Sequence, residues 1–236
     1  MSDERMVTCQ INPLAFLEAD LSGDKPTFES ILRFLCPVGE SVDVGNLLAR
    51  YREISTEPVR LFLAPAEQRI LDKLIWPLRN AKASFMVGNY LGTISLSGMV
   101  AEMVAMLLWE ITDAQINGRP MTKADETLLF VREFEKLGQE RRVAVLSAYG
   151  IIDDKTKSDF DKIREIRRRY LHLWSEDHER LPTDGVQSFH AAVSLVVTAI
   201  GQDVDKQTGI FLLNPRLMRY LERHQHSTDG NPKQHG

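Results

Sequence analysis

Residues 162–174, KIREIRRRYLHLW, are the starting point for predicting the fold. Apolar side chains recur every three or four positions, at Phe160 just before it and then at Ile163, Ile166 and Tyr170. This spacing is typical of a helix that buries one face. The sequence therefore predicts a helix of roughly 18 residues over 157–174, with its start near Ser158 or Asp159.

The basic residues of this helix point in different directions. Arg164, Arg168 and His172 recur four positions apart and form one exposed row, while Arg169 points away from it. Arg167 falls among the apolar residues. A guanidinium buried without a partner is costly, so Arg167 needs an acidic partner or a cleft. The exposed row, in contrast, has the chemistry of a phosphate-binding site.

The acidic partner that we expect for Arg167 is Glu102. It carries the only charge in MVGNYLGTISLSGMVAEMVAMLLW, residues 86–109, the most apolar helix of the sequence. We predict a buried ion pair between Glu102 and Arg167 that links two helices. The alternative is that either side chain extends to solvent from a helix end.

The same apolar segment raises the question of a membrane span, because it is long enough to cross a bilayer. It contains several polar side chains, and a carboxylate near its centre would cost roughly 2.5 to 3.5 kcal/mol on insertion. We therefore expect the buried central helix of a soluble protein, without membrane contact. The residues 1–10 lack the apolar core of a secretory signal, and the two cysteines form no CxxC motif, so we expect a cytoplasmic protein.

The organisation of the chain is predicted to be all-α. Residues 65–205 are expected to form a bundle of four to five helices, after an N-terminal helical extension over 1–64. A short helix and a disordered tail are expected over 206–236. Within the bundle, Pro77 should kink a helix, Thr122 should cap one that ends at Gly138, and residues 175–185 should form a polar loop.

The motif Ile163-Arg164-Glu165-Ile166-Arg167-Arg168, followed by His172, contains an R-x4-H pattern at the end of a long helix. Together with the upstream apolar helix and the apolar helix that follows, it resembles the HEPN superfamily (higher eukaryotes and prokaryotes nucleotide-binding domains) over residues 65–205. The family usually has Asn, Asp or His after the arginine, where this chain has Arg168.

The resemblance implies a helical bundle, commonly a two-fold dimer that joins two R-x4-H motifs in one cleft. Active members resemble metal-independent endoribonucleases, in which the RNA 2′-hydroxyl attacks the adjacent phosphate, so no metal or cofactor is expected. Carried over to this chain, His172 would be the general acid/base and Arg167 would stabilise charge on the phosphate. Arg164, Arg168 and Arg169 are then expected to contact phosphates.

Three functions remain open at this stage. The first is a dimeric endoribonuclease that acts on RNA, as a toxin or phage-defence factor with an antitoxin or another protein partner. The second is a catalytically inactive HEPN-like module for dimerisation or binding. The third is an α-helical transcriptional regulator, since the helix layout also resembles proteins of mannitol-repressor type. The net charge of −4 argues against a protein that coats nucleic acid generally.

Overall fold

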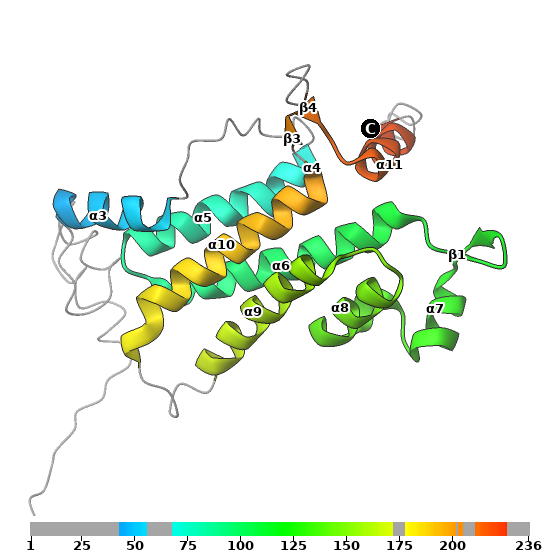
Figure 1. Cartoon of the computed structure of the whole chain (residues 1–236), viewed down its shortest axis with the longest axis horizontal. Coiled ribbons are helices and arrows are strands. Elements are labelled where there is room, and N and C mark those ends of the chain that lie inside the picture. The colour runs from blue at the N-terminus through cyan, green and yellow to red at the C-terminus, as the bar shows by residue number, and fades with distance from the viewer. Residues whose placement is uncertain (1–42, 56–67, 172–177, 202, 205–210, 226–236) are drawn as a thin grey trace, which may run out of the picture.

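The computed structural model describes residues 43–55, 68–171, 178–201, 203–204 and 211–225. Four long helices form the body of the molecule (Figure 1): α5 (Trp76–Met86), α6 (Tyr90–Thr112), α9 (Asp154–Leu171) and α10 (Leu181–Ile200). The all-α prediction is confirmed. Residues 1–42 and 56–64 of the expected N-terminal extension and the tail beyond 225 lie outside the described residues.

The other described elements surround these four helices. The helical ones are α3 (Val44–Ile54), α4 (Gln68–Ile70), the π-helix η2 (Leu71–Ile75), α7 (Lys123–Phe130), the 3-10 helix η3 (Phe134–Lys136), α8 (Gln139–Ala148), the 3-10 helix η4 (His178–Arg180) and α11 (Pro215–Gln225). Two antiparallel pairs join β1 (Gln115–Ile116) to β2 (Arg119–Pro120) and β3 (Asp203–Val204) to β4 (Phe211–Leu212).

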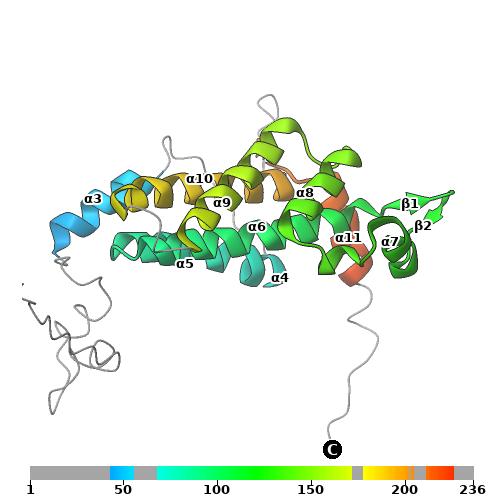
Figure 2. The same ribbon diagram turned by 90° about the horizontal axis from the view of Figure 1, so that it is seen from below.

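Helix α6 runs through the centre of the bundle and contacts α5, α9 and α10 (Figures 1 and 2). Its buried residues include Ile94, Val100, Val104 and Leu108. Among the described residues, α6 is the one helix long and apolar enough to cross a membrane, and half of its most apolar window is buried in the protein. This packing is the one predicted for a core helix, because the apolar side chains already have protein partners.

Pro77 does not end its helix but widens the turn before it. The chain passes from α4 through the π-helix into α5, and the amide of Trp76 donates to the carbonyl of Leu71, five residues back. A proline has no amide proton, and its ring clashes with the carbonyl four residues earlier. The wider π turn moves that carbonyl away, so the helix continues past Pro77 with one extra residue inserted.

The helix predicted from Thr122 to Gly138 ends early, and that prediction is wrong. Thr122 does cap α7, in a capping box with Asp125, but α7 ends at Phe130 and Val131 takes a left-handed conformation with φ of 73°. The reversal lets Phe134 stack on Trp109, with ring centroids 4.6 Å apart. Aromatic packing of this kind overrides the local helical propensity of residues 131–137.

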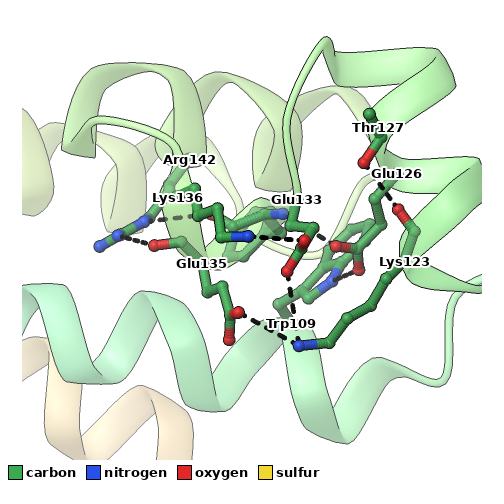
Figure 3. Close-up of polar contacts among 9 residues, drawn as sticks. Trp109, Lys123, Glu126, Thr127, Glu133, Glu135, Lys136 and Arg142 are labelled. Atoms are coloured by element: carbon green, nitrogen blue, oxygen red, sulfur yellow. Dashed lines mark hydrogen bonds and ion pairs between the residues drawn. The ribbon is translucent and has the colours of Figure 1, made fainter.

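A polar network fixes this reversal and holds the start of α8 (Figure 3). Glu126 accepts from the Trp109 indole nitrogen and from the Phe134 amide, both at 2.8 Å. Arg142 of α8 donates to the carbonyl oxygens of Phe134 and Glu135 at 3.3 and 2.6 Å. The first turn of α8 is thereby anchored beside α9 and α6, where it forms part of the candidate site.

Two helix starts also differ from the prediction. α9 begins at Asp154 rather than near residue 158, because the Asp153 carboxylate accepts from the Thr156 amide at 2.8 Å and starts the first turn. α10 begins at Leu181, inside the segment predicted as a loop, with Pro182 in its first turn. Proline is favoured there because the first amides of a helix need no intrahelical acceptor.

Candidate functional site

The predicted arginines lie around a cavity of about 320 Å³ where α6, α8 and α9 meet. Its lining residues come from all three helices: Gly98 and Ala101 from α6, Gln139 from α8, and Phe160, Ile163, Arg164, Arg167 and Arg168 from α9. The structure therefore brings Arg164, Arg167 and Arg168 to one place, while Arg169 is not part of this cavity.

The buried face of α9 is the one predicted from its periodicity. Phe160, Ile163, Ile166 and Tyr170 are all buried against the bundle. Because these side chains fix the rotation of the helix, they also fix the directions in which its arginines leave the backbone. The arrangement of the site thus follows from the packing of α9.

Arg167 pairs with Glu102, and the pair links α9 to α6. The side chains are 42% and 41% exposed, so the expectation that this pair is buried is wrong. The pair therefore lies at the rim of the bundle. Glu102 also borders a second cavity, of about 350 Å³, beside α11. Gly98 makes room for the Arg167 side chain, since a Cβ there would lie 2.8 Å from the Cδ of Arg167.

Arg164 is not the free phosphate ligand that the sequence predicts. Its guanidinium donates to Glu140 at 2.8 Å and to Asp161 at 3.1 Å, while its buried Nε has no hydrogen-bond partner in the described structure. Glu140 belongs to α8, so this ion pair attaches the start of α8 to α9. A phosphate would have to compete with two carboxylates for this side chain.

Arg169 has a partner that the sequence analysis missed. Its Nη1 donates to Asp184 of α10 at 2.5 Å, and the Tyr170 hydroxyl donates to the same carboxylate oxygen at 2.7 Å. Asp184 is 1% exposed. Burial, together with the hydrogen bond to Asp184, raises the pKa of Tyr170 to about 12. These contacts join α9 to α10, so the expected role of Arg169 as a phosphate ligand is not supported by its position.

Arg168 is the arginine that remains available. It is exposed, lies in the last turn of α9 at the rim of the cavity, and makes no hydrogen bond or ion pair to any residue that the structure describes. His172 follows α9 directly in the sequence but lies outside the described residues. The expected neighbourhood of Arg168 and His172 stays a prediction.

No group of three or more His, Cys, Asp or Glu side chains that could hold a metal ion occurs in the described ranges. The residue that sequence reasoning missed at this cavity is Gln139, whose two amide atoms are buried and without a partner. A glutamine directly after a helix-starting glycine carries no signal in a single sequence. Its position becomes visible only when α8 docks on α9.

Comparison of the chain with models of protein families, with curated proteins and with solved structures finds no match.

Proposed function

We propose that this protein is a metal-independent endoribonuclease of HEPN type that acts on RNA phosphodiesters as a dimer. The observation that carries the proposal is Arg168: an exposed, unpaired guanidinium, within the described residues, beside Arg167 and four residues before His172 in sequence. A planar, permanently charged group of this kind suits a phosphate.

The reaction needs only groups that the chain supplies. The 2′-hydroxyl of the RNA attacks the adjacent phosphorus, the new bond forms a 2′,3′-cyclic phosphate, and the bond to the 5′-oxygen of the next nucleotide breaks. His172 would take the proton of the 2′-hydroxyl or give one to the leaving oxygen, since imidazole titrates near neutral pH. Arg168 and Arg167 would stabilise the charge on the phosphate.

Arg167 has to exchange partners for this role, because it is paired with Glu102. Both side chains remain in contact with water, so replacing the carboxylate by a phosphate oxygen leaves no buried charge behind. The Glu102 carboxylate would compete with RNA for the same guanidinium. Glu102→Gln should therefore strengthen RNA binding, provided that Arg167 contacts the phosphate.

A dimer would allow Arg167 and His172 to act on the same phosphate. Residues five positions apart on a regular helix lie about 140° apart around the axis, so Arg167 and His172 would not share a face if regular helix continued to residue 172. In a two-fold dimer the arginine of one protomer and the histidine of its partner can face the same phosphate. Dimerisation is part of the proposal for this reason.

A second candidate function is a catalytically inactive binding module. It is favoured by the ion pairs of Arg164, Arg167 and Arg169, which give these three arginines structural partners within the chain. In that case Arg164, Arg167 and Arg169 hold the bundle together, and Arg168 is the one of the four α9 arginines that is available for an anionic partner.

The test is incubation of the full chain with labelled RNA in EDTA. Three variants accompany the wild type: His172→Ala, Arg168→Ala, and Arg132→Ala as a control, because Arg132 is also an exposed arginine but belongs to the α7–η3 connection. The proposal expects 2′,3′-cyclic ends, lost in His172→Ala, reduced in Arg168→Ala and kept in Arg132→Ala. A folded protein that binds RNA without cleaving it would instead support the binding module.

A further inference from the structure

The cavity between α6, α8 and α9 contains an unusual concentration of unsatisfied polar atoms. Five buried side-chain nitrogen and oxygen atoms lack a hydrogen-bond partner among the described residues, and three of them belong to Gln139 and Arg164 on this cavity. Buried polar groups in native proteins nearly always have partners, and exceptions often mark a place where a ligand or water binds. The Gln139 amide is the more telling case because both its donor and its acceptor are unused.

The rest of the cavity has the composition of a small-molecule site. Ala101, Phe160 and Ile163 are buried and give it an apolar wall. Arg168 lies on the same lining and is exposed, so a ligand held against the apolar wall would have a positive charge at its outer end. The volume of about 320 Å³ lies within the range of about 300–1,000 Å³ typical of ligand pockets.

A side-chain amide presents one donor and one acceptor next to each other. Adenine offers the complementary pair, an N6 donor beside the N7 acceptor, and glutamine binds this edge through two hydrogen bonds. We propose that this cavity receives the adenine base of a nucleotide, with Gln139 on N6 and N7 and Arg168 on the phosphate. In RNA, this placement would bring an adenosine phosphodiester to the arginines, and that part of the inference rests on the proposed function.

Access to Gln139 requires a local movement, because its amide atoms are not in contact with solvent in the free protein. Arg168 is suited to that movement, since it is a long exposed side chain on the lining and makes no hydrogen bond or ion pair to the described residues. Arg164 is less suited, because Glu140 and Asp161 fix its guanidinium. Nucleotide binding is therefore expected to reorient Arg168 and to leave the Arg164 ion pairs in place.

The experiment measures binding of adenosine monophosphate to the full chain by calorimetry, with cytidine and uridine monophosphates as comparisons. The variants are Gln139→Met, which removes both amide atoms at similar length, and Gln187→Met as a control on an exposed position of α10. Gln139→Met should weaken adenosine monophosphate binding about 5- to 150-fold, the usual value of a bidentate contact. Its melting temperature should not fall, because no hydrogen bond is lost. Gln187→Met should bind as the wild type does.

Three results would overturn the inference: no binding of adenosine monophosphate, equal affinity for all three nucleotides, or equal affinity in Gln139→Met and wild type. A short adenine-containing RNA that competes with the mononucleotide would identify RNA as the source of the base, and its failure to compete would point to the free nucleotide. Cleavage of RNA without Gln139-dependent adenine binding would contradict this inference and leave the nuclease proposal standing. Gln139-dependent binding without cleavage would contradict the nuclease and leave the adenine pocket.

Discussion

Asp184 is predicted to be the most important charged side chain for stability among those that contact the α9 arginines. It is almost completely buried and accepts two hydrogen bonds through one carboxylate oxygen, from Arg169 at 2.5 Å and from Tyr170 at 2.7 Å. Asp184→Ala removes the acceptor and leaves the buried Tyr170 hydroxyl without a partner. Arg169 is 27% exposed and can recover part of its solvation from water.

The expected loss follows from these differences in burial. An unsatisfied buried hydroxyl costs about 1–3 kcal/mol, and the lost hydrogen bond to a charged group about 1.5–3 kcal/mol before discounting for solvent. We expect Asp184→Ala to reduce the free energy of unfolding by about 3 kcal/mol. For a chain of 236 residues this corresponds to a fall of roughly 6–12 °C in the melting temperature.

Urea unfolding followed by circular dichroism measures this free energy. Glu165→Ala is the matched control, because it removes the same charge from an exposed position on α9 and should change stability by less than about 0.5 kcal/mol. Asp184→Asn should fall between the two, since its amide oxygen can still accept from Tyr170. If Asp184→Ala unfolds at the same urea concentration as Glu165→Ala, the buried contact does not stabilise the junction of α9 and α10.

Three further predictions concern single residues. Arg168→Ala should weaken RNA binding, reduce the slope of log affinity against log salt by about 1 and leave stability unchanged; an unaltered salt slope in a titration series would exclude a phosphate contact. Val131→Gly should raise the free energy of unfolding by about 1 kcal/mol, because valine at φ of 73° carries a conformational penalty that glycine avoids. Chemical denaturation measures this gain, and equal stability of the two proteins would show that the conformation is unstrained. Because the pKa of Tyr170 is raised from about 10 to about 12, folding favours its protonated form, so its contribution to stability is complete below pH 10 and lost between pH 10 and 12. Tyr170→Phe should remove this part of the alkaline loss in thermal melts, and equal pH profiles of the two proteins would contradict the assignment.

The parts of the structure predicted from sequence are those that depend on local spacing. The buried residues of α9 follow from the recurrence of Phe160, Ile163 and Ile166, which needs no knowledge of neighbouring helices. The partner of Arg167 followed from a charge argument, since Glu102 is the one acidic residue in the most apolar segment. Its half-exposed setting did not follow, because exposure depends on how α6 and α9 sit at the rim of the bundle.

The missed features all depend on tertiary contacts. The end of α7 at Phe130 is decided by Trp109 and Glu126, which hold Phe134 in place. The partner of Arg169 was missed because Asp184 lies in a polar segment that the sequence predicts as a loop. In the structure this segment forms the first turns of α10. The ion pair of Arg164 with Glu140 likewise joins two helices whose docking cannot be read from either one alone.

The π turn before Pro77 also sets the phase of one side of the molecule. Ile70 and Leu74 face the cavity beside α11 that Met103, Met106 and Leu217 also line. If residues 71–75 were wound as an ordinary α-helix, everything upstream would be rotated by about 100° relative to α5. Ile70 would then turn away from that cavity, although every amino acid lining it would still be present. The wider π turn takes up the extra residue within about one turn, so it keeps two stretches of one helix aligned with different neighbours.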